Sequence, residues 1–482
     1  MSDQLSFPKN GVNPEEVLKL MQEYKAEDVD WKHGRSFSLT YPVSNDHHEF
    51  LKKAHNMFFS ENALNPMAFK SLRRFEHETI RMCADIFHGG EEMVGLVTSG
   101  GTESLLMAIK SYRERARKLK PWILKPEMIV PETIHSAVDK GGYYFDVKVR
   151  HAPIGPDYRV DLKAVRKMIN RNTILIMGSA PQYPHGVVDP IIQLGEIAEE
   201  YNLPLHVDAC IGGFVLPFIE KLGHPVPVFD FRVPGVTSIS ADIHKYGYAA
   251  KGASALMYRN MSYMKYQFFV YTKWKGGGIY ASPSFPGTRP GGPIAAAWAT
   301  LMKLGEDGYL DLTKKVLETR DYFVKELSKI PDLKLLAYPD STLVSFCSQN
   351  QKLGIYAVAD QLQAKGWNVT RQQDPESIHL TISPVHHEHM TEFVSDLKEA
   401  VEKVKSHPEL NTQGQAAMYG MMAKIPFKGM IKGSVMGIME KMYGANNKSI
   451  DDKKDEVETW GDFAEKLGTN AFELWSKIKK SK

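Results

Sequence analysis

Short apolar runs alternate with helical segments through the middle of this chain, and this alternation restricts the fold more than any other feature. Helical apolar spacing is clear in Thr102–Leu119 and again in Ile192–Tyr201. The strand-like runs are Gly95–Ser99, Met128–Val130, Thr173–Met177, Leu205–Ala209, Val236–Ser240 and Ser254–Tyr258. Alternation of this kind predicts an α/β fold with a mostly parallel sheet that is covered by helices on both faces.

Three of these runs end next to residues that carry chemistry. Ser99 ends the first run, Asp208 stands near the end of a later one, and Lys245 follows shortly after Val236–Ser240. Ligands of parallel α/β sheets bind beyond the carboxyl ends of the strands. We therefore expect these three side chains to face one cleft.

The stretch Ser240–Tyr248 places a lysine directly after a histidine, in a turn that follows a strand. An amine that forms a Schiff base and a carboxylate that keeps a pyridinium nitrogen charged are the two groups that a pyridoxal phosphate enzyme needs. Lys245 and Asp208 supply these groups, so the sequence predicts pyridoxal 5'-phosphate bound covalently to Lys245. His244 and Ser238 are placed to reach the phosphate of this coenzyme.

A glycine turn, Ser99-Gly100-Gly101-Thr102, opens the helix after the first strand. Its glycines let the backbone approach an anion, the helix dipole attracts the anion, and the Thr102 hydroxyl adds a donor. Alone, this pattern also fits an ordinary turn with Thr102 as the helix cap. Together with the lysine and the aspartate it predicts a phosphate cradle. His135 is placed to stack on the pyridine ring, and a buried structural histidine is the alternative.

The chain divides into four segments by its sequence pattern. Residues 1–65 form an N-terminal arm, 66–310 a large coenzyme-binding α/β domain, and 311–410 a smaller C-terminal α+β domain. Residues 411–482 combine the methionine-rich segment Met418–Met442 with a charged end, Ile450–Lys482, that is predicted to be helical.

Composition excludes several kinds of protein. A net charge of +3 over 482 residues is too small to indicate nucleic-acid binding. The chain has no run of about 18 apolar residues, so no membrane span is predicted. Its N-terminus, Met1 to Asp30, is polar and lacks the apolar core of a secretory signal. The cysteines Cys83, Cys210 and Cys347 are far apart, so we expect free thiols in a reducing compartment and no metal site. These features favour a cytoplasmic protein and leave open whether a bacterial cell would deliver it elsewhere.

Several stretches carry a resemblance to a known family. They are Val97–Ser104, Ser240–Gly252, Tyr266–Val270, Gly278–Pro283 and Arg289–Gly292. From about Gly34 to Gly420 the chain resembles the group II branch of fold-type I pyridoxal phosphate enzymes, and within that branch the sphingosine-1-phosphate lyases. The related amino-acid decarboxylases share the His-Lys pair and the aspartate but are not similar through Lys245–Gly252, so Lys251 is the discriminating residue.

The resemblance implies a fold-type I architecture with a seven-stranded sheet, and a homodimer with shared active sites at the subunit interface. It implies that Tyr41 is a substrate-phosphate residue reached from the partner chain. Where the family pattern has a histidine near Asn65, this chain has asparagine. An asparagine donates a hydrogen bond to a phosphate but carries no charge.

The resemblance also implies an activity, the retro-aldol cleavage of a phosphorylated sphingoid base to a long-chain aldehyde and phosphoethanolamine. Lys251 either neutralises the substrate phosphate or, with a lowered pKa, transfers a proton. Tyr246 and Tyr248 are alternatives for the proton step, and simple aromatic packing is the other interpretation of both.

Two other functions stay open. An amino-acid decarboxylase on the same scaffold needs a group that recognises a substrate carboxylate, and Arg289 is the candidate. A non-catalytic protein that binds a membrane surface or a partner would use the methionines of Met418–Met442 and the lysine-rich end. Dimer packing and a solvated terminal helix explain that segment equally well.

Overall fold

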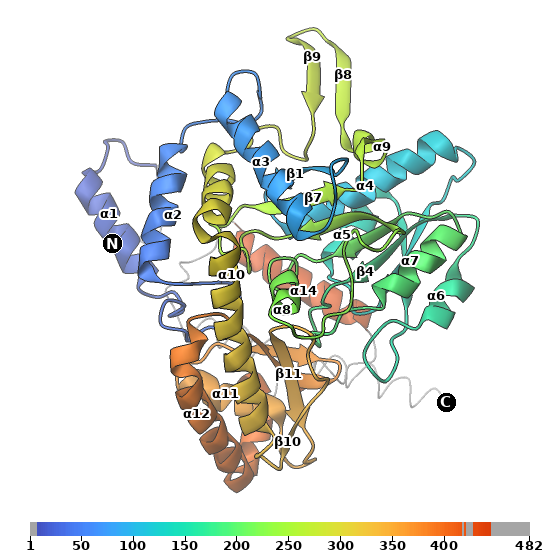
Figure 1. Cartoon of the computed structure of the whole chain (residues 1–482). Coiled ribbons are helices and arrows are strands. Elements are labelled where there is room, and N and C mark those ends of the chain that lie inside the picture. The colour runs from blue at the N-terminus through green and yellow to red at the C-terminus, as the bar shows by residue number, and fades with distance from the viewer. Residues whose placement is uncertain (1–6, 417–418, 421–427, 445–482) are drawn as a thin grey trace.

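A computed structural model of the chain describes residues 7–416, 419–420 and 428–444 (Figure 1). The predicted helical end, Ile450–Lys482, lies outside these residues, as does part of Met418–Met442. The segment that is described there forms α14 (Lys428–Tyr443). Among the helices of the described residues, none combines the length and the apolar character that a bilayer crossing demands.

A seven-stranded sheet forms the centre of the molecule, as predicted. In spatial order its strands are β1 (Val94–Thr98), β7 (Ser254–Tyr258), β6 (Val236–Ala241), β5 (Leu205–Asp208), β4 (Thr173–Ser179), β2 (Glu127–Pro131) and β3 (Lys148–Ala152). β7 is antiparallel to both of its neighbours, and the other pairs are parallel. The carboxyl ends of β1, β5 and β6 therefore lie at the same edge of the sheet.

Both faces of the sheet are buried. Successive strand residues point to opposite faces of a sheet, so neighbouring residues of one strand report on the packing of both faces. Met128 and Val130 pack into one apolar cluster and Ile129 into the other. The first cluster includes residues of α4 (Gly101–Leu119) and α5 (Ala137–Phe145). The second includes residues of α3 (Lys70–Ile86), α7 (Ile191–Glu200), α8 (Leu216–Lys221) and α10 (Gly291–Leu327). The helices thus cover both faces, in agreement with the prediction.

A long helix, α10, connects the large sheet region to the smaller unit (Figure 1). The sequence predicts this helix only from Asp311, but α10 begins at Gly291, with non-helical backbone at Gly305. Its first turn needs glycine, because a Cβ on Gly291 would lie 2.9 Å from the carbonyl oxygen of Phe58 and one on Gly292 2.7 Å from the His55 ring. Close packing on α2 (Asn45–Met57), and not turn formation, explains this glycine pair.

The segment before α10 holds a hairpin for which the sequence analysis names no strands. Its strands, β8 (Phe269–Trp274) and β9 (Gly278–Ser282), pair with each other and project from the rest of the molecule (Figure 1). Two short helices, α9 (Met261–Met264) and η1 (Lys265–Gln267), precede it.

The smaller C-terminal unit is an antiparallel sheet with two helices, an α+β arrangement. Its strands, in spatial order, are β10 (Leu333–Leu335), β11 (Leu343–Ser348), β13 (Glu376–Thr381) and β12 (Thr370–Gln373). Helices α11 (Ile355–Ala364) and α12 (His386–Ser406) pack on each other, followed by η2 (Pro408–Thr412). Two further helices are α1 (Pro14–Lys25) and α6 (Leu162–Met168). The domain boundaries at 65, 310 and 410 stay predictions.

Candidate active site

A cavity of about 360 Å³ opens at the carboxyl edge of the large sheet. The loop Ser99–Thr102 after β1, Asp208 at the end of β5, and His244 and Lys245 after β6 all line it, as does His135. The structure therefore brings the predicted lysine, carboxylate and glycine loop into one cavity, although they are far apart in the sequence.

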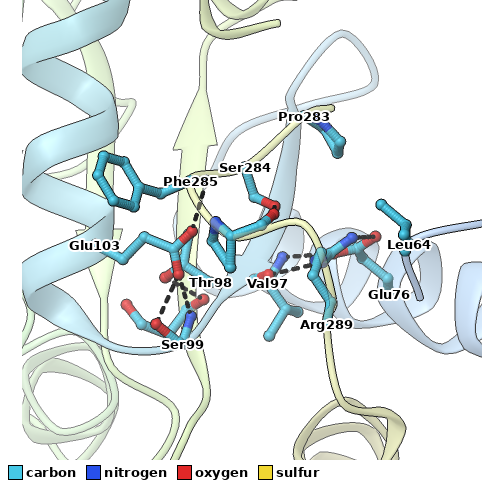
Figure 2. A network of polar contacts seen from close by, with 12 residues as sticks. Leu64, Glu76, Val97, Thr98, Ser99, Glu103, Pro283, Ser284, Phe285 and Arg289 are labelled. Carbon is cyan, nitrogen blue, oxygen red and sulfur yellow. Dashed lines mark hydrogen bonds and ion pairs between the residues drawn. The ribbon is translucent and has the colours of Figure 1, made fainter. Parts of the chain in front are cut away.

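The glycine loop leaves the first turn of α4 open. Helix α4 begins at Gly101 and has no side-chain cap, so its first N–H groups are free to bind an anion. A Cβ on Gly101 would lie 2.8 Å from Oδ2 of Asp242 and 2.9 Å from Sγ of Cys210, so no larger residue fits there. The backbone N–H and hydroxyl of Ser99 both donate to Oε2 of Glu103, each at 2.7 Å, which fixes the shape of the loop (Figure 2).

Asp208 ends β5 and is 7% exposed. Its Oδ1 accepts the backbone N–H of Cys210 at 3.0 Å, and within the described residues Oδ2 makes no hydrogen bond. A carboxylate that is held on one oxygen and open on the other suits a charged partner in the cavity.

Lys245 forms an ion pair within its own turn. Its Nζ lies 3.0 Å from Oδ2 of Asp242, three residues earlier. Burial alone would lower the pKa of Lys245, but the Asp242 carboxylate raises it above its ordinary value. His244, next to Lys245, accepts the backbone N–H of Ala253 on Nδ1 at 3.2 Å and lies against Gly100, 3.3 Å from the position of a Cβ there.

His135 lies at the rim of the cavity, where the backbone of α5 sets its ring orientation. Its Nδ1 accepts the N–H of Ala137 at 3.1 Å, so a neutral ring carries its proton on Nε2. The ring lines the cavity as the sequence predicts, and it is exposed, which argues against the alternative of a buried structural histidine.

A second cavity of about 570 Å³ adjoins the first, and His244 lines both. Tyr41, Tyr248 and Lys251 line the second cavity. Lys251 Nζ lies 5.0 Å from the centre of the Tyr41 ring. Burial and the nearby Lys245 lower the pKa of Lys251 to about 8.

Tyr41 lies at the second cavity of its own chain. It packs against Lys251 and, edge to face at 5.0 Å, against the Tyr246 ring. The segment that carries Tyr41 leads directly into α2, which lines the same cavity. The implied contribution of Tyr41 from a partner chain stays a prediction.

Two further predicted residues lie away from the coenzyme cavity. Ser238 is fully buried early in β6, where its hydroxyl bonds to Tyr112 and to His206, so it does not reach the phosphate cradle as predicted. Tyr246 lines neither cavity and donates its hydroxyl hydrogen to the carbonyl oxygen of Ile382 at 2.7 Å. This contact favours packing over proton transfer for Tyr246.

The side chains of Arg289 and Asn65 also bind other groups of the protein. The buried Arg289 guanidinium forms an ion pair with Glu76 and donates to the carbonyl oxygen of Val97 at 2.8 Å (Figure 2). It therefore does not face a substrate carboxylate in the cavity. The Asn65 side chain accepts the N–H of Met67 at 3.0 Å and forms a local turn.

The sequence analysis missed several residues of the cavity, among them Asp242, Cys210 and Tyr183. Asp242 stands within the quoted lysine motif, and its position beside Lys245 is a signal that was available. Cys210 follows Asp208 closely but was assigned only as a buried thiol. Tyr183 comes from the loop after β4, and no local pattern indicates it.

Pyridoxal 5'-phosphate fits this set of groups. The uncapped start of α4, which Gly101 lets pack closely on Asp242 and Cys210, suits a phosphate. The open Oδ2 of Asp208 suits a pyridinium nitrogen, and Lys245 supplies the amine for covalent attachment. All of them face one cavity of coenzyme size.

Comparison with known proteins agrees with this fit. Residues 14–349 match the model of the pyridoxal-dependent decarboxylase conserved domain. Sphingosine-1-phosphate lyase 1 of Rattus norvegicus is 44% identical over 86% of this chain and 73% of its own length. The structure of Burkholderia pseudomallei sphingosine-1-phosphate lyase aligns with a TM-score of 0.83 and 35% identity, over 92% of this chain and 98% of that one. A probable L-aspartate decarboxylase of Pyrococcus furiosus is 34% identical over 76% of this chain and 95% of its own length.

Proposed function

The chain belongs to the pyridoxal-dependent decarboxylase family and within it to the sphingosine-1-phosphate lyases, and on that premise we propose that it cleaves phosphorylated sphingoid bases to a long-chain aldehyde and phosphoethanolamine. The observation that carries this proposal is the pair of adjoining cavities. One holds Lys245, Asp208 and the glycine loop, and the other holds Lys251 and Tyr41.

The first cavity is proposed to bind pyridoxal 5'-phosphate. Lys245 attaches it, Asp208 keeps its ring nitrogen protonated, and the N–H groups at the start of α4 bind its phosphate. His135 would lie against the ring, and in its neutral form it carries its proton on Nε2. The coenzyme, when bound, would supply an electron sink for the breaking carbon–carbon bond.

The second cavity is proposed to receive the charged head of the substrate. Lys251 and Tyr41 offer a cation and a phenol to its phosphate, at the point where the cavities meet beside His244. Lysine is a good phosphate partner because its three N–H donors rotate freely. The remaining volume suits an alkyl chain, since Trp31, Val43 and Leu51 line it.

Lys251 is also placed to move a proton. With a pKa of about 8, its Nζ exchanges a proton readily near neutral pH. Tyr246 is less suited to this step because its hydroxyl is already bound to the carbonyl oxygen of Ile382. The two possible roles of Lys251, phosphate neutralisation and proton transfer, predict opposite pH dependences of kcat/KM.

An amino-acid decarboxylase on the same scaffold is the second candidate, and one observation weakens it. Arg289, the residue available to recognise a substrate carboxylate, is buried in an ion pair with Glu76. The identity to the rat lyase, 44%, also exceeds the identity to the aspartate decarboxylase, 34%.

Product analysis separates the two activities. The coenzyme-loaded protein is incubated with phosphorylated sphinganine, and separately with aromatic and acidic amino acids. We expect fatty aldehyde and phosphoethanolamine in equal amounts from the first, and no carbon dioxide from the second. Carbon dioxide without aldehyde would refute the lyase assignment, and Lys245→Ala is the inactive control.

We also propose that the protein is a cytoplasmic homodimer. The hairpin supports the dimer, because every residue of β8 is exposed and Val270, Trp274 and Ile279 present 58%, 51% and 72% of their surfaces to solvent. A projecting strand pair with this much apolar surface suits a protein interface. Sedimentation velocity should give a species of twice the chain mass, and Trp274→Ser with Ile279→Ser should shift it toward the monomer. Membrane contact through the C-terminal segment stays a prediction.

A further inference from the structure

Asp242 is the carboxylate that contacts the coenzyme lysine. It follows β6 directly, its side chain is 2% exposed, and its Oδ2 lies 3.0 Å from Nζ of Lys245. Its other oxygen, Oδ1, is buried and has no hydrogen-bond partner in the described part of the chain. A buried carboxylate with one free oxygen depends on the lysine for most of its stabilisation.

The other groups near Lys245 do not replace this contact. Tyr41, Tyr183 and Cys210 approach it from three different elements, and burial raises the pKa of each, so all three are neutral near pH 7. The cation Lys251 opposes the charge of Lys245. His244, whose pKa burial lowers, lies 3.7 Å from Asp242 on Nε2.

Asp208 is the other carboxylate of the cavity, and its position differs from that of Asp242. Its Oδ1 is held by the backbone N–H of Cys210, and it forms no ion pair with Lys245. The two carboxylates therefore divide their partners, with the lysine amine on Asp242 and the coenzyme ring nitrogen on Asp208.

We propose that Asp242 is a positioning residue that holds Lys245 as an ammonium whenever its amine is not bonded to the coenzyme. This state exists before the coenzyme is loaded and again while a substrate amine occupies the place of the lysine. The contact keeps the free amine within the cavity and close to the place where it must react again. The inference rests on coenzyme binding and is independent of which substrate is cleaved.

The proposal has a kinetic consequence. An amine attacks a carbonyl only in its neutral form, so a counter-ion that favours the ammonium slows the attachment of the coenzyme near neutral pH. Attachment should then accelerate as the pH rises. Without the carboxylate, burial of Lys245 dominates and the neutral amine forms at lower pH.

The test measures coenzyme uptake and not turnover. Coenzyme-free full-length protein is mixed with pyridoxal 5'-phosphate in a stopped-flow spectrometer, and the visible absorbance is followed between pH 6 and 9. For the wild-type protein, the rate of coenzyme attachment should rise over the whole range from pH 6 to 9. Asp242→Asn should reach its maximal rate at lower pH and be about tenfold faster or more at pH 7, since one pKa unit changes the neutral fraction about tenfold.

Two variants make the result specific. Glu132→Gln removes an exposed carboxylate just beyond β2 that lines neither cavity, so its pH profile should keep the wild-type shape. Asp242→Glu keeps the charge and should return the profile toward wild type. An Asp242→Asn profile equal to the wild-type profile overturns the proposal, as does a Glu132→Gln profile that shifts equally.

A second measurement covers the case in which Asp242→Asn does not fold. Nζ of Lys245 in the coenzyme-free wild type is then labelled by reductive ¹³C-methylation and titrated by NMR. The proposal requires Lys245 to stay charged beyond the ordinary lysine range, and a titration below that range overturns it. No sphingoid base enters either experiment, so an error in the proposed substrate leaves both results readable.

Discussion

Lys251 carries a charge that changes close to neutral pH. Burial and the neighbouring Lys245 lower its pKa to about 8, so it is a cation below that pH and neutral above it. If Lys251 binds the substrate phosphate, kcat/KM should fall as the pH rises through about 8. If it acts as a base, kcat/KM should rise instead. The pH profile of cleavage therefore distinguishes the two roles. We expect kcat/KM to fall as the pH rises, as it should if Lys251 binds the substrate phosphate.

The control for this profile is Lys251→Arg, which stays charged at all relevant pH values. Its falling limb should move beyond pH 9 if only charge matters. A Lys251→Arg profile that keeps a limb at about 8 would mean that another group titrates there.

Arg289 is predicted to act on stability and not on substrate recognition. It is 7% exposed and its partner Glu76 is largely buried, so Arg289→Ala leaves a charge unpaired. Breaking a buried pair in this way costs about 3–5 kcal/mol. Urea unfolding should show this loss, while the double variant Arg289→Leu with Glu76→Leu should recover part of it. An unchanged stability together with a raised KM would place Arg289 at the substrate.

Residues whose position depends on a single strand were predictable, and those that depend on distant partners were not. Asp208 and Lys245 follow apolar runs, and the ends of parallel strands meet at one edge, so their convergence follows from local pattern. The hydroxyl of Tyr246 instead finds the carbonyl oxygen of Ile382, in the smaller unit. Arg289 finds Glu76 on α3. No spacing in the sequence indicates such contacts.

Helix α4 is the element on which coenzyme binding depends most directly. Its first residue, Gly101, lies against Asp242 and Cys210, so Gly101→Ala forces a Cβ within 2.8–2.9 Å of both. We expect the affinity for pyridoxal 5'-phosphate to fall at least about tenfold, a change of about 1.4 kcal/mol. Equilibrium titration of the visible absorbance measures it.

Gly287→Ala is the matched control for this glycine. A Cβ on Gly287 would meet its nearest atom, the Tyr280 hydroxyl oxygen, at 3.5 Å, which is ordinary contact. Its coenzyme affinity should equal that of wild type. If wild type, Gly101→Ala and Gly287→Ala all bind the coenzyme with equal affinity, the glycine loop does not contribute to coenzyme binding.

Strands with apolar sequences were predictable and the polar or exposed strands were not, for a physical reason. A strand that is buried on both faces must be apolar along its length, as β4 is, and such runs stand out in the sequence. β3 lies at the edge of its sheet and is largely exposed, so its polar sequence shows no signal. The hairpin β8–β9 is exposed as well, and its glycines suggested only turns.

The molecule as a whole should lose stability in mild acid. Burial lowers the pKa of His185, His206 and His386 to about 4 and that of His379 to about 3. The unfolded chain binds protons at these histidines near pH 6.5, so it holds more protons than the folded state between about pH 6.5 and 4. Folding stability is therefore complete above about pH 6.5 and decreases as the pH falls through this window.

Calorimetry of the coenzyme-free protein tests this behaviour. Tm should fall steadily from pH 7 to pH 4.5, although Asp189, whose pKa burial raises to about 6, acts in the opposite direction as a single group. His379→Phe keeps a ring against Tyr183 and removes one of the four groups, so its Tm should fall less steeply. A Tm that is constant between pH 7 and 5 would contradict the assignment of these histidines as buried and neutral.

The central claim is that one cavity gathers the lysine, the carboxylate and the glycine loop around a single coenzyme. Borohydride reduction of the coenzyme-loaded protein, followed by peptide mass spectrometry, tests it most directly because it fixes the coenzyme to the residue that holds it. The account predicts one pyridoxyl group per chain, on Lys245. A label on Lys251 or on surface lysines, or no label at all, would contradict it.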